Sequence, residues 1–385
     1  MSDLSYCAAP WRGLHINFRG DVKTCCAGDP NMLGTLLQHD IQDIVLGAKL
    51  IEIRRHIQQG QLHPEYCRNC IKAEEYGRSE RHWHNDVNQD FDVASAALDD
   101  FSPTIIDIRW NTTCNLSCNY CGEYCSSKWQ SIKKGEIVKN GARPYYQQIC
   151  DFLEQHAPNI KEVALVGGEP LLLPENERLL DVIPQDCIVT LITNTSVDLE
   201  NNKIFRKIAK RHRVGWSMSF DNIDQRFEYV RHGAEWGKLN HNINIIKDLM
   251  QNQGHWGGVH AVYNIYNCTR LTEFRKWIHD NNLTVLWQNL FQPDYLDPMR
   301  HEDALKQIAL QEASTLVEQC GSYMSESELQ FFEHARANLS NPSTDAVKIT
   351  SAFASHIHII ETKWHPDKAG QFAQLWPELE FLCRK

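Results

Sequence analysis

The sequence lacks the features that mark a membrane, secreted, fibrous or disordered chain. Its 385 residues contain no run near the roughly 18 apolar residues that a membrane span needs. The segment MSDLSYCAAPWRG has no basic stretch followed by an apolar one, so we expect no secretory signal and a cytoplasmic location. No short-period repeat or low-complexity tract is present. With 42% hydrophobic and 23% charged residues, the composition is that of an ordinary globular protein.

A surplus of positive charge is also lacking. The chain has 39 Lys and Arg residues against 49 Asp and Glu residues, a formal net charge of −10. Nucleic acids attract proteins mainly through basic surfaces. The charge therefore disfavours a nucleic acid as the main ligand.

Cysteine, in contrast, is abundant. In a reducing compartment, cysteines serve as metal ligands or catalytic groups more often than as disulfides. Two groups stand out among the 14 cysteines: Cys7, Cys25, Cys26, Cys67 and Cys70, and then Cys114, Cys118, Cys121 and Cys125. The scattered ones are predicted to be small core side chains: Cys150, Cys187, Cys268, Cys320 and Cys383.

Short apolar runs alternate with helical stretches from residue 104 onward. The six runs are 104–110, 162–167, 187–193, 214–220, 259–265 and 284–290. The helical candidates between them include 145–157, 202–212, 239–253 and 271–282. Strands that alternate with helices predict an α/β fold with a parallel sheet, rolled or open.

The flanking segments differ from this central pattern. Residues 1–85 contain short predicted elements separated by turn-forming residues. We predict a hairpin around the Gly20-Asp21 turn and a helix over 40–60. The Asp-rich segment 86–103 resembles a linker, and 291–385 is a predicted helical extension. We thus expect a small cysteine-rich α+β domain, a linker, a core over 104–290 and a C-terminal extension.

Three cysteines follow the first strand of the core directly. Cys114, Cys118 and Cys121 have C-x3-C-x2-C spacing, and sites in α/β proteins form at the carboxyl ends of parallel strands. Three thiolates can hold three irons of a cubane and leave the fourth iron open. The alternative is a zinc site that uses Cys125 as the fourth ligand.

A second short motif ends the next strand. Gly167 and Gly168 expose backbone groups to a close ligand, and Glu169 can accept a hydrogen bond from an ammonium group. A simple turn would also account for this sequence.

CNLSCNYC followed by GGEP resembles the radical S-adenosylmethionine (SAM) superfamily over about 105–290. The resemblance implies a partial (β/α)6 TIM-like barrel. It implies a [4Fe–4S] cluster on the three cysteines of the triplet, with SAM on the fourth iron. Tyr120 would then lie by the adenine, and the SAM amino group would meet Gly167, Gly168 and Glu169.

Weaker candidates lie at later strand ends. Asn194, Ser219 and Arg231 resemble the superfamily's polar contacts to SAM, although strand-end caps or a surface arginine explain them equally. Asp221 either meets the substrate or caps the next helix. Asp221 and Cys125 are the candidates for a catalytic group.

The N-terminal cysteines carry a second resemblance. Cys7, then Gly20 and Cys25, then Cys67-x2-Cys70 resemble the SPASM/twitch domain of radical SAM enzymes. This implies an auxiliary [4Fe–4S] cluster on Cys7, Cys25, Cys67 and Cys70. Cys26 is an alternative to Cys25, and a structural zinc site is the alternative to the cluster. In better-known members this domain follows the barrel, whereas here it precedes it.

The two resemblances together imply an enzyme that reductively cleaves SAM to a 5′-deoxyadenosyl radical and removes a hydrogen from its substrate. Family analogy suggests oxidation, cross-linking or epimerisation of a peptide residue. Remodelling of a small molecule in natural-product biosynthesis is the alternative, and a non-enzymatic zinc or iron–sulfur protein is a third reading. Flavodoxin or ferredoxin is the usual electron donor.

Overall fold

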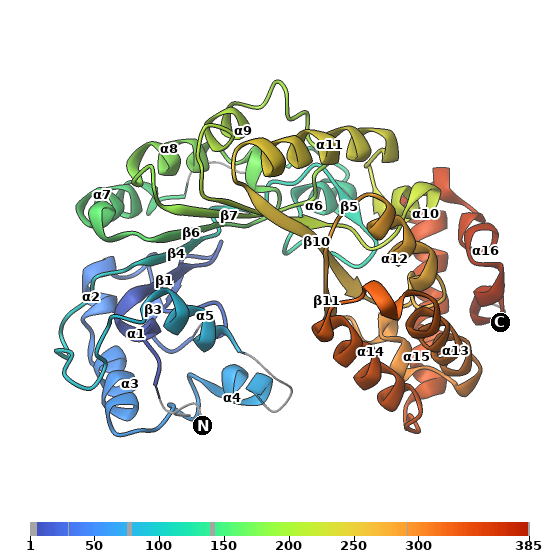
Figure 1. The fold of residues 1–385 in the computed structure, drawn as a ribbon, viewed down its shortest axis with the longest axis horizontal. Coiled ribbons are helices and arrows are strands. Elements are labelled where there is room, and N and C mark those ends of the chain that lie inside the picture. Colours follow the sequence, from blue (N-terminus) through green and yellow to red (C-terminus); the bar gives the residue numbers. More distant parts are fainter. Residues whose placement is uncertain (1–5, 30, 75–78, 139–142, 291, 384–385) are drawn as a thin grey trace.

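A computed structural model describes residues 6–29, 31–74, 79–138, 143–290 and 292–383. One large sheet organises these residues, with nine strands in the order β11-β10-β8-β7-β6-β4-β1-β2-β3 (Figure 1). Six strands belong to the core of the chain: β4 (Ile105–Ile108), β6 (Glu162–Leu165), β7 (Ile188–Thr193), β8 (Val214–Ser219), β10 (Trp256–Tyr263) and β11 (Val285–Asn289). Each pairs in parallel with its neighbour. The predicted α/β class and parallel sheet are confirmed.

Helices cover one face of this sheet. In Figure 1, α7, α8, α9 and α11 lie along its upper side. Phe205 of α9 packs on Trp216 of β8 at a ring separation of 5.9 Å, and Phe274 of α12 packs on Trp287 of β11 at 5.7 Å. The helices that connect or follow the core strands are α7 (Tyr146–His156), α8 (Pro174–Val182), α9 (Lys203–Ile208), α10 (Asp224–Val230), α11 (Trp236–Asn252) and α12 (Leu271–Asp280).

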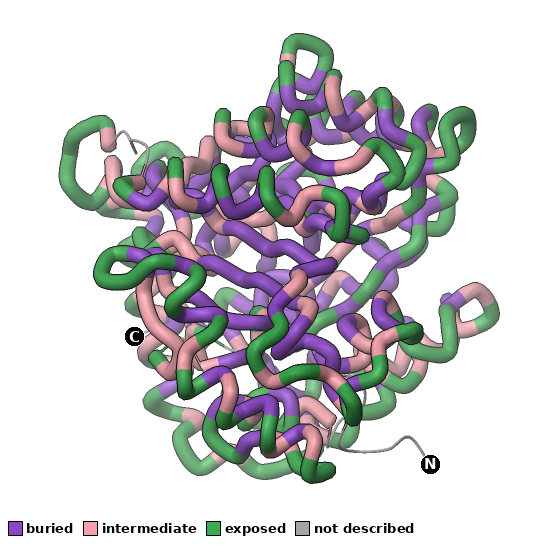
Figure 2. The backbone as a smooth tube through the Cα atoms, turned by 90° about the vertical axis from the view of Figure 1, so that its left-hand side faces the viewer, coloured by how far each residue is buried: buried purple, intermediate pink, exposed green. Residues whose placement is uncertain are grey.

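The opposite face of the sheet stays partly accessible, at β7 within the sheet and at the edge strand β11. Ile192 in β7 keeps 36% of its surface and Leu286 in β11 keeps 62%. In the strand register, Ile192 lies beside Ser217, and His260 lies beside Leu286. Because residues two apart on a strand share a face, these side chains all lie on the face opposite the helices. Figure 2 shows buried strands at the centre and exposed residues concentrated in outer helices and loops. This face is therefore where a ligand can reach the sheet.

The predicted N-terminal hairpin is confirmed, and it belongs to the same sheet. Its strands are β1 (Gly13–Ile16) and β2 (Asp21–Lys23), followed by β3 (Gly34–Thr35). β1 also pairs in parallel with β4, with Gly13 opposite Ile105 and Ile16 opposite Ile108. The cysteine-rich segment thus extends the core sheet at its β4 side.

The predicted helix over 40–60 is wrong in one respect, because two helices replace it. One helix ends at Val45 and the next begins at Ala48, with Gly47 in the turn between them. A Cβ at Gly47 would come within 2.7 Å of the Asp43 carbonyl oxygen, so glycine suits this tight turn. The N-terminal helices are α1 (Ala9–Arg12), α2 (Ile41–Val45), α3 (Ala48–Gln58), α4 (Arg68–Glu74) and α5 (Glu80–Val87). The predicted linker begins within α5 and packs on the N-terminal elements, since Trp11 donates to the Ala97 carbonyl and Arg54 to the Leu98 carbonyl.

The C-terminal region is helical, as predicted. A buried ion pair between Arg275 and Glu328, with a 2.7 Å contact, joins α12 to α14. The helices are α13 (Asp303–Cys320), α14 (Glu326–Leu339), α15 (Ala346–Ile359) and α16 (Gln371–Leu375). Among the described residues, none of the helices combines the length and apolar character that a membrane crossing requires.

Candidate functional site

The loop after β4 is held in place by a small second sheet and one helix. β5 (Ser117–Cys118) pairs antiparallel with β9 (Arg231–His232), which sets Cys118 opposite Arg231. Trp129, in α6 (Ser127–Lys134), donates its indole N–H to the Cys118 carbonyl at 2.9 Å. Ser126 caps α6 and donates its hydroxyl to the Leu116 carbonyl at 2.7 Å. The positions of the loop cysteines therefore depend on elements far apart in the chain.

The three thiols of the triplet face one another. Burial and the nearby Cys118 thiolate raise the pKa of Cys114 to about 12. A hydrogen bond to Cys125, then burial and Cys118, raise the pKa of Cys121 well above its usual value. Cys118 is thus within electrostatic reach of both other thiols.

Cys125 has a different environment. The Cys121 hydrogen bond lowers its pKa to about 7, against the opposing effect of its own burial. Arg109 lowers it further. Cys125 is therefore the most readily ionised of the four thiols in this loop.

The spacing of the sulfur atoms favours a cluster over a single zinc ion. Zinc–sulfur bonds of about 2.3 Å in a tetrahedron set the sulfurs about 3.8 Å apart. Within the described ranges, which include every cysteine, no three cysteine sulfurs lie within 4.8 Å of one another. In the part of the chain that the structure describes, the thiols are therefore farther apart than the ligands of one tetrahedral zinc ion.

The GGEP turn after β6 packs directly on this loop. A Cβ at Gly168 would stand 2.3 Å from the Thr113 carbonyl oxygen, and Gly167 has a φ of +142° that glycine tolerates best. The Glu169 N–H donates to the Thr113 carbonyl at 2.8 Å. Both glycines are thus required for the turn to lie against the cysteine loop.

Glu169 is a fully buried carboxylate. It accepts hydrogen bonds from the Thr193 hydroxyl at 2.8 Å, the Asn194 N–H at 2.8 Å and the Leu171 N–H at 3.1 Å. Burial nevertheless raises its pKa to about 7. A cationic group placed beside it would favour its ionised form.

Asn194 joins the end of β7 to the same cysteine loop. Its amide group donates to the Asn115 side chain at 2.9 Å and reaches the Cys114 sulfur at 3.8 Å. The structure thus brings the segments that follow β4, β6 and β7 together at Cys114.

Tyr120, Asp221 and Arg231 form one buried network. Asp221 accepts from the Tyr120 hydroxyl at 2.6 Å, the Arg231 guanidinium at 3.2 Å and the Val262 N–H at 2.7 Å. Because both carboxylate oxygens are engaged and only 1% of the residue is exposed, Asp221 orients its neighbours. Ser219 is half-buried at the end of β8 and lies apart from this network.

The four N-terminal thiols that the spacing singled out line one small cavity. Cys7, Cys25, Cys67 and Cys70 surround it, together with Tyr66 and Arg81. Arg81 is 3% exposed and holds both carboxylate oxygens of Glu74, at 2.9 and 2.8 Å. Its positive charge lowers the pKa of Cys7 and Cys67, against the larger effect of burial, which raises both. This cavity suits four thiolates around a negatively charged cluster.

Cys25 and Cys26 point to different surroundings. Burial and then the Cys7 and Cys70 thiols raise the pKa of Cys25. Cys26 is exposed as a residue, although its sulfur is crowded by neighbouring atoms; this crowding, then Glu80 and Asp107, raises its pKa to about 12. Cys25 therefore faces the four-thiol cavity, and Cys26 faces the seam with the core sheet.

Sequence reasoning missed the side chains at that seam. His15 of β1 and Asp107 of β4 are opposite each other in the register and 2.8 Å apart, and Arg109 lies 3.5 Å from the same carboxylate oxygen. Tyr66, whose hydroxyl accepts from the Thr24 N–H at 2.7 Å, also went unnoticed. No local signal marks these residues, since each depends on a partner distant in the chain.

Two family models match parts of the chain. Residues 7–71 match the iron–sulfur cluster-binding domain SPASM, and residues 107–214 match a 4Fe–4S single cluster domain. The first range holds the four-thiol cavity, and the second holds the triplet and the GGEP turn.

Curated relatives match the chain over part of their length. An S-adenosylmethionine-dependent nucleotide dehydratase of Fibrobacter sp. (strain UWH6) is 28% identical over 171 residues, which are 38% of this chain and 48% of that relative. A 7-carboxy-7-deazaguanine synthase of Clostridium acetobutylicum is 34% identical over 90 residues, 23% of this chain and 36% of that relative. The chain thus spans half or less of the curated relatives it matches. The crystal structure of Streptococcus suis SuiB has a TM-score of 0.41 at 15% identity, over 71% of this chain and 63% of that one.

Proposed function

Because the chain belongs to the radical SAM superfamily and carries a SPASM iron–sulfur domain, we propose that it uses SAM to remove a hydrogen atom from a peptide residue, which it oxidises, cross-links or epimerises. The observation that supports this most is the meeting of three strand ends at the cysteine triplet. When bound there, a reduced cluster and SAM supply a carbon radical able to abstract an unactivated hydrogen. The sheet would form the partial (β/α)6 barrel of that superfamily.

The residues around the triplet have distinct proposed roles. Cys114, Cys118 and Cys121 would hold three irons. Glu169 would accept from the SAM ammonium group, which favours its ionised state. Gly168 keeps the turn close enough for this contact.

The remaining polar residues would position the cofactor. Asp221 holds the hydroxyl of Tyr120 and the guanidinium of Arg231, so it would fix the groups we expect beside SAM. Asn194 would orient Cys114 through its amide. These are positioning roles, and the substrate itself would reach the accessible face of the sheet.

The four-thiol cavity would hold an auxiliary [4Fe–4S] cluster. Thiolates at all four irons leave no open corner, so this cluster would accept or relay an electron. Buried Arg81 would offset its negative charge. A flavodoxin or ferredoxin in the cytoplasm is the proposed electron donor.

A small-molecule substrate is the second candidate. It is favoured by the curated relatives, whose names describe a nucleotide dehydratase and a deazaguanine synthase. Turnover with deuterated peptides and deuterated nucleotides separates the two, since label appears in 5′-deoxyadenosine only from the true substrate.

The activity itself is tested by removing the triplet. The variant C114A/C118A/C121A, reconstituted anaerobically, should form no 5′-deoxyadenosine and should drop from about eight irons to about four. The matched control Cys187→Ala removes a buried thiol far from both groups and should keep both properties. SAM cleavage by the triple variant would refute the proposal.

A further inference from the structure

Two groups of metal-ligating side chains lie outside the cysteine sites in the part of the chain that the structure describes. Each combines two histidines and one carboxylate whose ligand atoms lie within 4.8 Å of one another. The groups are Glu52, His56 and His63, and His232, His365 and Asp367.

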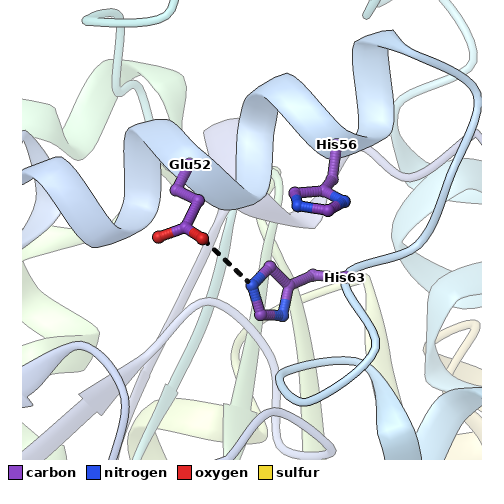
Figure 3. Close-up of side chains that lie close together, drawn as sticks. All are labelled: Glu52, His56 and His63. Atoms are coloured by element: carbon purple, nitrogen blue, oxygen red, sulfur yellow. Dashed lines mark ion pairs between the residues drawn. The ribbon is translucent and has the colours of Figure 1, made fainter.

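The first group is engaged in a different task. Glu52 and His56 project from α3 toward His63, and an ion pair of 3.8 Å joins Glu52 to His63 Nε2 (Figure 3). His63 Nδ1 accepts the Tyr66 N–H at 3.1 Å, so the neutral ring carries its proton on Nε2. That nitrogen has no lone pair for a metal. The His63 carbonyl accepts the Cys67 N–H at 2.9 Å, so the group orients the Cys67 loop.

The second group joins two distant parts of the chain. His232 lies in β9, opposite Ser117 of β5, and His365 follows α15. Their rings stack at a centroid distance of 3.6 Å and an angle of 23°. Asp367 lies two residues further on, with its carboxylate 4.0 Å from His232 Nδ1.

Each ring presents one buried nitrogen without a partner. His232 Nδ1 and His365 Nε2 are shielded from solvent and make no hydrogen bond. A buried polar atom left unpaired costs roughly 1–3 kcal/mol. Ligand atoms of the two rings and of the Asp367 carboxylate lie within 4.8 Å of one another, so a single cation could contact all three side chains.

The backbone around His365 suits such a cation. The ring interacts with the backbone of Ser117 and of Trp364, and Nε2 is the ring nitrogen left without a hydrogen bond. Ligating histidines commonly donate their other ring N–H to a backbone carbonyl.

We propose that His232 Nδ1, His365 Nε2 and the Asp367 carboxylate bind a divalent ion of the zinc class, with water at the remaining position. Imidazole and carboxylate ligands suit zinc and its borderline neighbours, and three protein ligands plus water is a common zinc arrangement. The ion would fasten the segment after α15 to β9, and so to the β5 strand that carries Cys118. This inference stands whether or not the chain cleaves SAM.

Charged side chains around the site both oppose and favour a bound cation. Lys128 and Lys368 both act on His232 and oppose a cation, while Asp367 favours one. Asp367 is 61% exposed, so it can move toward the ion at little cost. Removal of its charge should therefore lower affinity strongly.

The test is calorimetric titration of Zn²⁺ into the reconstituted protein with both cluster sites filled. We expect one site in the wild type and at least about tenfold weaker binding in Asp367→Asn, which alters an exposed side chain and leaves the fold intact. The matched control His241→Gln changes an exposed histidine 3.5 Å from Glu200 and should bind as the wild type.

A second variant addresses the buried ligand. His365→Gln should abolish the site, and elemental analysis after dialysis should find no zinc beyond background. Equal affinity in wild type and Asp367→Asn, or no zinc uptake by the wild type, would overturn the proposal. Because the readout is zinc, neither result depends on turnover.

Discussion

At the residue scale, surroundings decide the role of each cysteine. Cys25 and Cys26 are adjacent in the chain, yet one faces three other thiols and the other faces Glu80. A cubane needs four converging sulfurs, which only Cys25 can complete. Spacing alone leaves this choice open.

The pair gives a sharp prediction. Cys25→Ser should lower the iron content of the reconstituted protein from about eight atoms to about four, because the auxiliary cluster loses a ligand. Cys26→Ser should keep about eight, since its side chain lies outside the cavity. Iron assay with absorption spectroscopy measures both. The reverse result would make Cys26 the ligand.

The sequence could identify candidate thiols, but it could not predict what surrounds them. Cysteine spacing and GGEP are local patterns, so they identify candidate ligands directly. The Tyr120 hydroxyl meets Asp221 across 101 positions, and the Arg81 side chain completes the N-terminal cavity from α5. Such contacts depend on the tertiary fold, which periodicity does not encode.

At the element scale, predictions succeeded where local patterns dominate. Five of the six core strands lie within the predicted apolar runs, because buried parallel strands consist of β-branched and aliphatic residues. The sixth, β10 (Trp256–Tyr263), begins three residues before its predicted run of 259–265. The two-residue strands β5 and β9 were missed, since they are too short to show periodicity. The break at Gly47 was missed because apolar spacing continues across it.

Because the GGEP turn packs against the cysteine loop, a methyl group added at Gly168 should lower the stability of the protein. Gly168→Ala should destabilise the protein by roughly 1–3 kcal/mol and speed iron loss, because the Cβ would press on the Thr113 carbonyl 2.3 Å away. Gly237→Ala, in α11 with nothing within 4 Å, should be neutral or slightly stabilising. Urea unfolding and iron retention over time measure the difference. Equal behaviour of the two variants would show that the turn yields freely.

The free energy of unfolding should depend on pH through His301, which lies in the segment before α13. This ring is fully buried, and its Nε2–H donates to the Tyr295 carbonyl while the Thr350 hydroxyl lies beside Nδ1. Burial lowers its pKa to about 4. The unfolded chain takes up a proton below about pH 6.5 and the folded ring does not, so stability falls as the pH drops from 6.5 toward 4.

The expected size follows from that shift. Between pH 7 and about pH 5, the unfolding free energy of His301→Gln should fall by roughly 2 kcal/mol less than that of the wild type. Urea titrations at both pH values test this. Parallel losses in the two proteins would mean that His301 is protonated at no cost in the fold.

At the scale of the whole molecule, one sheet unites the two cysteine regions. β1 takes the position beside β4, so the N-terminal segment covers what would otherwise be an open edge of the core. The sequence predicts a boundary between residues 1–85 and 104–290, and that division remains a prediction. It could not reveal this pairing, because strand partners far apart in sequence leave no local trace.

The shared sheet predicts that the core does not stand alone. A fragment over 104–385 should express mainly as aggregate, because removal of β1 exposes the hydrogen-bonding edge of β4 and its apolar side chains. Sedimentation of the soluble fraction, with the full chain as control, measures this. A soluble monomeric fragment would show that β4 tolerates exposure.

The continuity of β1 with β4 has a further consequence. Residues 13–16 of β1 pair in parallel with residues 105–108 of β4, and this ladder joins the backbone near both sets of thiols. If both cysteine groups hold the proposed clusters, this direct strand pairing would help to keep the length of an electron-tunnelling path between them constant.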